Sequence, residues 1–210
     1  MRSFALELHS HCYLEVSIPS SLEFVTEEVC IELFLYNEGE KYLICRSMVR
    51  NILESLTWKL EQAVHHKLYC SFGEDIGYLY NQFFYSQECY ENKPFSEFRL
   101  ASASWDYPHL TTWLYNDESG QILLQTTELY YWFLTERGKD RKYVFYKTFI
   151  RDYKPLITWV IPHQVARKWL AQCQYALAVM WADEKRYAYK HAHLKAEGRC
   201  QECLDEAAEK

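Results

Sequence analysis

Residues 30–45 read CIELFLYNEGEKYLIC, and this stretch decides the fold class. Strand-like segments over 30–36 and 41–45 flank a loop of Asn37, Glu38, Gly39 and Glu40. Asn and Gly supply the positive φ values that a tight hairpin requires, so we expect Asn37 and Gly39 to provide them. Residues 4–18 also alternate between apolar and polar, with a break near 9–11. The first 45 residues are therefore predicted to form an antiparallel meander.

The hydrophobic period changes after the meander. Apolar residues over 47–67 recur every four positions, which indicates an amphipathic helix that packs onto the sheet. A second helix is predicted over 74–87. The clearest helix begins at Pro162, where a missing N–H costs nothing, and is expected to run to about residue 195.

The segments between these helices complete the expected order. We predict a loop over 88–109, strands over 111–115, 121–125, 129–134, 142–146 and 156–161, and a short helical turn over 147–153. Strands and helices follow one another without regular βα alternation, which favours an α+β fold. It would be a largely antiparallel sheet with an N-terminal meander, packed by two or three amphipathic helices. A single domain over 1–190 and a peripheral C-terminal tail over 191–210 are expected.

Composition restricts the class of protein. The chain has 210 residues, of which 49% are hydrophobic and 25% charged, with only 6 Gly and 5 Pro, and this excludes disordered and collagen-like proteins. Aromatic residues reach 17%, including 18 Tyr, so we expect some rings on the surface, where Tyr and Trp favour recognition. The longest apolar run near the C-terminus, 169–182, is too short to span a membrane. The N-terminus lacks a signal-peptide pattern and the 8 cysteines are spread along the chain, so we predict a cytoplasmic protein with reduced thiols.

Charge is distributed unevenly along the chain. Residues 1–40 are acidic and residues 137–190 are basic, with aromatic residues between the bases. Bases interleaved with rings bind single-stranded nucleic acid in some proteins, so a nucleic-acid-associated protein using 137–190 is one alternative. The formal net charge of −6 and the pI of about 5.8 oppose it.

Two groups of residues have metal-ligand chemistry. The first group lies near the C-terminus, and its two imidazoles and two thiolates can form a tetrahedral zinc site. Its spacing matches no common zinc finger. The alternative is a helical tail with incidental thiols. The second group is His9 and His11, which would share a face of one strand and lack an identifiable third ligand. The C-terminal group consists of His191, His193, Cys200 and Cys203.

Sequence motifs that would carry catalysis are absent. The chain has no G-x-S-x-G nucleophile elbow and no phosphate-binding glycine loop. We therefore expect no enzyme activity and no cofactor, with a zinc-dependent metalloprotein or enzyme as the alternative.

The second half of the chain resembles a known class of proteins. The resemblance is carried by 113–117 (WLYND) with Gly120, by 122–124 (ILL), by 149–155 (FIRDYKP) and by 169–170 (WL), and it covers residues 110–175. These segments are similar to small bacterial immunity-type proteins that accompany polymorphic or contact-dependent toxins. The resemblance implies a cytosolic inhibitor that binds the catalytic domain of a toxin and catalyses no reaction. It assigns no role to any residue, because this class binds its targets through variable surfaces.

Acidic residues of the first forty positions supply a hypothesis for the partner-binding surface. Carboxylates along strands over 22–40 would mimic phosphates and occupy a basic nuclease cleft, with one tyrosine as the anchor. The predicted residues are Glu23, Glu27, Glu28, Glu32, Tyr36, Glu38 and Glu40.

Overall fold

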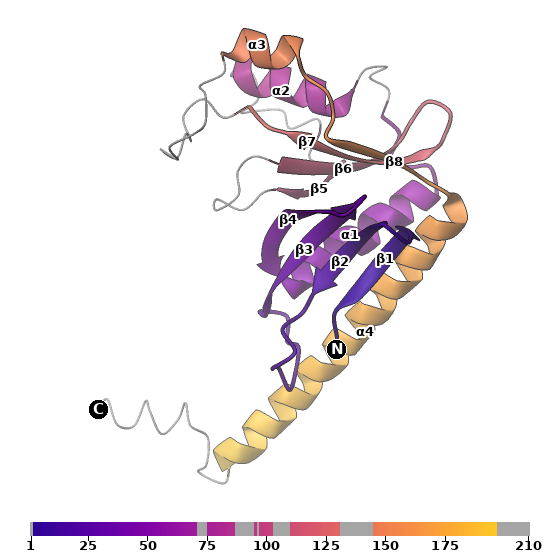
Figure 1. The fold of residues 1–210 in the computed structure, drawn as a ribbon. Helices are drawn as coiled ribbons and strands as arrows, with labels where there is room; N and C mark the ends of the chain where they lie inside the picture. The colour runs from indigo at the N-terminus through magenta and orange to yellow at the C-terminus, as the bar shows by residue number, and fades with distance from the viewer. Residues whose placement is uncertain are drawn as a thin grey trace.

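The computed structural model describes residues 2–70, 75–86, 95, 97–102, 110–130 and 145–196 (Figure 1). Its strands form two antiparallel sheets, and the predicted α+β class with an N-terminal meander is confirmed. Sheet A has the order β1-β2-β3-β4, with β1 Phe4–His9, β2 Cys12–Ser17, β3 Cys30–Asn37 and β4 Glu40–Met48. Sheet B has the order β5-β6-β7-β8, with β5 Arg99–Ser102, β6 Leu110–Asn116, β7 Ile122–Glu128 and β8 Ile157–Ile161.

Sheet A buries one of its two faces. Period-two alternation places Leu14, Leu33 and Leu35 on the inner face, where each is at most 1% exposed. Helix α1, Val49–Val64, lies behind the sheet in Figure 1, and the long helix α4, His163–Ala196, runs along its β1 edge. The apolar stripes of both helices close the core over this inner face.

Helix α4 also covers the free edge of β1. The indole Nε1 of Trp169 donates to the backbone carbonyl of Glu7 at 2.9 Å, and Gln172 Nε2 donates to that of Ala5 at 3.3 Å. An edge strand with unpaired carbonyls is a template for aggregation, so these two bonds protect the sheet as well as anchoring the helix.

Sheet B is covered on both faces. Helix α1 contacts one face, where Asn116 Nδ2 donates to the Ala63 carbonyl at 3.0 Å. Helices α2, Ile76–Ser86, and α3, Tyr146–Arg151, lie over the other (Figure 1). The Asp75 carboxylate joins helix to sheet there, accepting bonds from Tyr153 Oη and Gln125 Nε2, both at 2.8 Å.

Several expected elements differ in the structure. Strand β5 lies in the predicted loop over 88–109, and Tyr146 begins α3 where a strand over 142–146 was predicted; residues 131–144 lie outside the described ranges. Strand β8, predicted to be buried, is an edge strand that buries alternate residues and leaves Val160 54% exposed. The predicted domain end at residue 190 falls within α4, which continues to Ala196.

A buried lysine gives the fold a specific pH dependence. Lys59 of α1 is 6% exposed and its Nζ donates to the Glu97 carbonyl at 2.6 Å. Burial, and then the nearby Arg99, lowers its pKa to about 8. The folded state therefore binds this proton less tightly than the unfolded chain. Below pH 8 the buried charge destabilises the fold by its full amount. This destabilisation disappears as the pH rises towards the lysine pKa of the unfolded chain, about 10.4.

We expect Lys59→Met to raise the free energy of unfolding at pH 7 by about 1–3 kcal/mol, because it removes a buried charge while keeping the aliphatic stem. The gain over the natural chain should shrink at pH 10. Urea unfolding of both proteins at both pH values measures it, with Lys67→Met, at an exposed lysine beyond α1, as the control. An equal gain at the two pH values would contradict the assignment.

Candidate functional site

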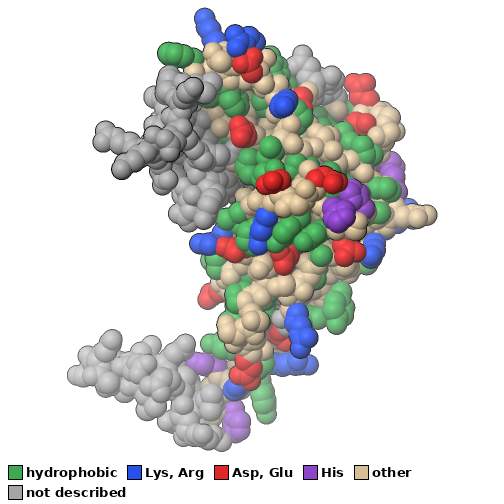
Figure 2. All heavy atoms as spheres, in the orientation of Figure 1, with side chains coloured by type: hydrophobic (Ala, Val, Ile, Leu, Met, Phe, Trp, Pro, Cys, Tyr) green, Lys and Arg blue, Asp and Glu red, His purple; other side chains and the backbone are tan. Residues whose placement is uncertain are grey.

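The side of sheet A that faces away from its core is the principal candidate for a binding surface. We call it the outer face. In Figure 2, which views this side, hydrophobic side chains lie among acidic and basic ones over the sheet. It consists of the outward-pointing residues of the four strands: Glu7, Tyr13, Glu15, Glu32, Phe34, Tyr36, Lys41, Leu43 and Arg46.

Aromatic rings form the centre of the outer face. Tyr13 and Tyr36 pair directly across β2 and β3, and their rings stack with centroids 4.4 Å apart and planes 14° apart. The Lys41 ammonium lies 3.8 Å from the Phe34 ring centroid. The rings are therefore held in place by cross-strand pairing and by a cation–π contact.

Polar groups fix the orientation of these rings. Tyr36 Oη donates to Glu15 Oε2 at 2.9 Å, and partial burial raises the pKa of the Tyr36 phenol. On the neighbouring pair of strands, Arg46 Nε donates to Glu32 Oε1 at 3.0 Å. The outer face thus combines an aromatic centre with a rim of both charges.

The predicted partner-binding residues come from three parts of the fold. Glu32 and Tyr36 lie on the outer face, and Glu38 and Glu40 lie at the β3–β4 turn. Glu23, Glu27 and Glu28 lie in the segment 18–29, which is irregular and carries a turn closed by the Val29 N–H and the Thr26 carbonyl at 3.1 Å. The strands expected over 22–40 are therefore present from Cys30 onward, and residues 18–29 are not a strand.

Two of these acids are paired with distant bases. Lys190 Nζ lies 2.7 Å from Glu23 Oε2, and Arg50 Nη1 lies 2.8 Å from Glu27 Oε2. Both pairs connect the segment 18–29 to helices α1 and α4. The charges of Glu23 and Glu27 are partly neutralised within the fold. This weakens the hypothesis that these two acids mimic phosphates in a basic cleft.

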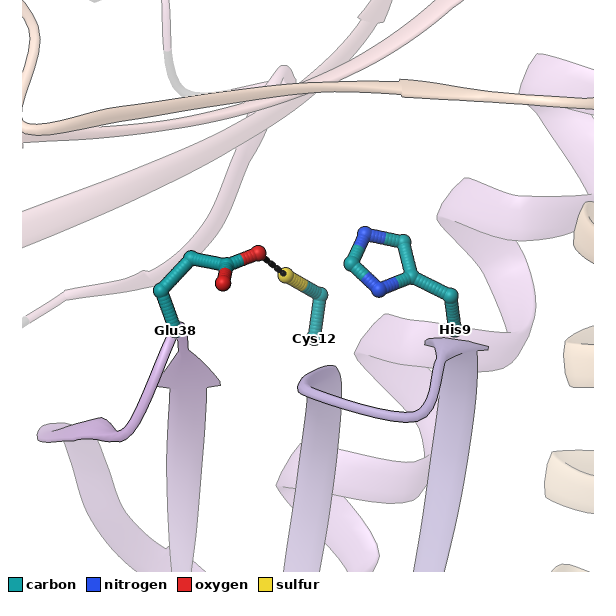
Figure 3. Close-up of side chains that lie close together, drawn as sticks. All are labelled: His9, Cys12 and Glu38. Atoms are coloured by element: carbon teal, nitrogen blue, oxygen red, sulfur yellow. Dashed lines mark hydrogen bonds between the residues drawn. The ribbon is translucent and has the colours of Figure 1, made fainter.

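A compact cluster of possible metal ligands lies at the turn end of sheet A (Figure 3). The ligand atoms of His9, Cys12 and Glu38 all lie within 4.8 Å of one another. His9 ends β1, Cys12 begins β2, and Glu38 follows β3, so three neighbouring strands supply one group each. The predicted sharing of one strand face by His9 and His11 was wrong, because residues 10–11 form the β1–β2 turn.

Backbone geometry determines the shape of the cluster. The register of β1 shifts between Glu7 and His9, and this irregularity places His9 opposite Cys12. Glu38 has φ 50° and Gly39 has φ 93°, so the left-handed positions of the turn are Glu38 and Gly39, and not Asn37 as predicted. The Glu38 N–H donates to the His11 carbonyl at 3.0 Å and joins the two turns.

The Cys12 thiol lies at the centre of this cluster. It is 2% exposed and within hydrogen-bonding reach of Asn37 Oδ1 at 3.4 Å and Glu38 Oε1 at 3.6 Å. The Asn37 amide oxygen also accepts from Trp159 Nε1 at 2.9 Å, which connects the cluster to sheet B. Burial, more than any other effect, raises the pKa of this thiol, so the thiol is protonated at neutral pH when no metal is bound.

The C-terminal histidines lie on α4. The ring centroid of His191 is 6.0 Å from that of Tyr187, and the ring centroid of His193 is 6.4 Å from that of Tyr189. Two residues of a helix that are two positions apart point in different directions. Cys200 and Cys203 lie outside the described residues, so the zinc site over these four residues stays a prediction.

The basic region over 137–190 holds both exposed and buried rings: Phe145, Tyr175 and Tyr189 are 68%, 73% and 77% exposed. Trp159 and Trp169 are 5% and 1% exposed, so they belong to the core. Phe149 packs against Tyr130 with ring centroids 5.3 Å apart. Residues 137–144 lie outside the described part of the chain.

Comparisons with known proteins return no match: no family model, no curated protein and no solved structure is similar to this chain. Among the helices that the structure describes, none combines the length and apolar character needed to cross a bilayer.

Proposed function

We propose that the chain is a non-catalytic, cytoplasmic protein-binding module of the immunity type, which neutralises a toxin by binding its catalytic domain. The outer face of sheet A would be the binding surface. The observation that carries the proposal is the group of Tyr13, Phe34 and Tyr36 projecting away from the core. Among the described residues, no helix or strand packs over these rings.

The arrangement of the rings favours affinity. Tyr and Phe bury large areas for few rotatable bonds, and Tyr keeps a polar group for water or for a partner. Tyr36 is already stacked on Tyr13 and bonded to Glu15, so binding would cost little additional side-chain entropy. Tyr36 is therefore the expected anchor, as in the hypothesis from the sequence.

The charge on the rim favours a basic partner. The outer face carries three acids, Glu7, Glu15 and Glu32, against two bases. Arg46 is paired with Glu32, and Lys41 interacts electrostatically with Glu15. The formal net charge of −6 acts in the same direction and would speed the encounter with a basic catalytic domain. In this proposal the rings supply affinity, and the acids steer and orient the partner.

Single-stranded nucleic acid also stacks on exposed rings, but it is the less favoured ligand. Binding to phosphates requires a basic surface. Carboxylates of Glu7 and Glu15 on the same face, with the net negative charge, would repel a polyanion. The proposal would be contradicted by an oligonucleotide that binds the natural chain at physiological salt and binds Tyr36→Ala much more weakly.

The test compares the half-buried Tyr36 of the outer face with an exposed tyrosine elsewhere. A tagged chain is used to isolate its partner from the cells that encode it, and the purified partner is titrated against three proteins by calorimetry. We expect Tyr36→Ala to weaken binding by about 30-fold or more, which is the effect of losing an interface anchor. Tyr189→Ala is the matched control, because Tyr189 is 77% exposed and lies on α4, outside the outer face.

A growth assay tests the inhibitor part of the proposal. The isolated partner, expressed alone, should arrest growth, and co-expression of the natural chain should restore it while Tyr36→Ala restores it less. A harmless partner would contradict the immunity function. Equal binding by Tyr36→Ala and the natural chain would contradict the assignment of the surface.

A further inference from the structure

The cluster of His9, Cys12 and Glu38 has no role in the proposed interface. Cys12 is buried on the inner side of sheet A, and the other two residues are exposed at the end of the sheet. In Figure 3 the imidazole and the carboxylate lie on either side of the thiol, and all three side chains extend beyond the strand ends. Packing of the described core does not explain why His9 and Glu38 lie beside Cys12.

The spacing of these three groups suits a transition-metal ion. Zinc binds sulfur at about 2.3 Å, imidazole nitrogen at about 2.0 Å and carboxylate oxygen at about 2.0–2.2 Å, in tetrahedral geometry. Ligand atoms around such an ion are therefore about 3.3–3.8 Å apart. The Cys12 Sγ–Glu38 Oε1 distance is 3.6 Å, and the whole set lies within 4.8 Å. The His9 and Glu38 side chains are exposed, so they have room to turn towards these shorter separations.

The backbone under the cluster is fixed, whereas the outer ligands can turn. Cys12 pairs with His9 across β1–β2 and with Asn37 across β2–β3. The bond from the Glu38 N–H to the His11 carbonyl holds the two turns together. A bond from Trp159 Nε1 to Asn37 Oδ1 restrains the amide beside the thiol. These contacts fix the position of Cys12 at the end of the sheet.

We propose that His9, Cys12 and Glu38 bind a divalent transition-metal ion of the zinc class. One thiolate, one imidazole and one carboxylate form a mixed ligand set that suits Zn²⁺ and Co²⁺ and disfavours Mg²⁺ and Ca²⁺. On binding, the sulfur–metal bond forms as the thiol proton leaves to the buffer, without a change in oxidation state. Three protein ligands leave a fourth position for water or for a group from a partner.

Metal titration of the full chain tests this site. Co²⁺ is added to the reduced, metal-free protein, and the thiolate-to-cobalt charge-transfer band is followed; Zn²⁺ then displaces the cobalt. We expect one ion per chain and one proton released from the thiol. Cys12→Ala should abolish the band, and His9→Gln and Glu38→Gln should each weaken binding by about tenfold or more.

Three control variants separate this site from others. His11→Gln changes the exposed imidazole of the same turn, and Cys30→Ala removes an exposed thiol of β3. The double variant Cys200→Ala/Cys203→Ala removes the thiols of the predicted C-terminal site. All three should keep the band and the affinity of the natural chain.

Circular dichroism of each variant checks that loss of binding is not loss of folding. Glu38→Gln is decisive, because it alters an exposed side chain and keeps its size. A band that persists in Cys12→Ala, a band lost in Cys200→Ala/Cys203→Ala, or an unchanged affinity in folded Glu38→Gln would each overturn the proposal.

Discussion

We expect the Trp169→Ala variant to lose about 3–5 kcal/mol of unfolding free energy, the usual cost of removing a buried tryptophan. Trp169 is 1% exposed, and it belongs to the stripe by which α4 packs on sheet A. The substitution also removes the donor to the Glu7 carbonyl at 2.9 Å. That carbonyl lies on the edge strand β1, so the variant should aggregate more readily as well as unfold at lower urea concentration.

Two further substitutions separate the causes. Trp169→Phe keeps an aromatic ring but not the N–H, and should lose about 1–3 kcal/mol. Tyr189→Ala alters an exposed ring of the same helix and should change stability by less than about 0.5 kcal/mol. If Trp169→Ala were as stable as Tyr189→Ala, α4 would not pack on sheet A as described.

Gly77→Ala is expected to destabilise the layer of α2, α3 and sheet B by about 2–4 kcal/mol, through a steric clash and lost hydrogen bonds. A Cβ atom at position 77 would lie 2.2 Å from Tyr153 Oη and 2.6 Å from Thr127 Cγ2. Tyr153 Oη bonds to Asp75 Oδ1 at 2.8 Å and to Thr127 Oγ1 at 2.6 Å, so it is not free to move away. Urea unfolding followed by circular dichroism measures the loss.

A double-mutant cycle identifies the atom that clashes. Tyr153→Phe removes the hydroxyl, so Gly77→Ala should cost less in the Tyr153→Phe background than in the natural chain. Gly39→Ala is the comparison for backbone effects, because Gly39 has φ 93° and no atom within 4 Å of the added Cβ. It should lose about 1 kcal/mol. A neutral Gly77→Ala would contradict the packing of α2 on β7.

Local patterns predicted most of the fold. The hairpin over 30–45, the α1 stripe and the helix after Pro162 were all confirmed, because period-two and four-residue spacing depend on neighbours in the chain. Strand β5 escaped prediction because four residues carry too little periodicity. The positive φ of Glu38 was assigned to Asn37, since residue type alone favours Asn in that conformation.

The site was less predictable than the fold, because it depends on distant residues. The partner of Glu23 is Lys190, and the two are 167 positions apart, which no local pattern can indicate. Glu38 approaches Cys12 only after three strands have paired in register. Tyr36 was predicted as the anchor of the acidic surface, but its stacking on Tyr13 could be found only from the pairing of β2 with β3.

Side-chain footprinting of the complex tests the central claim, that a protein partner binds the outer face of sheet A. The free chain and its complex with the isolated partner are exposed to hydroxyl radicals, and oxidation of each tyrosine is quantified by mass spectrometry. Our account predicts that oxidation of Tyr13 and Tyr36 falls sharply on binding while that of Tyr189 is unchanged. Protection of Tyr189 with undiminished oxidation of Tyr13 and Tyr36 would contradict it.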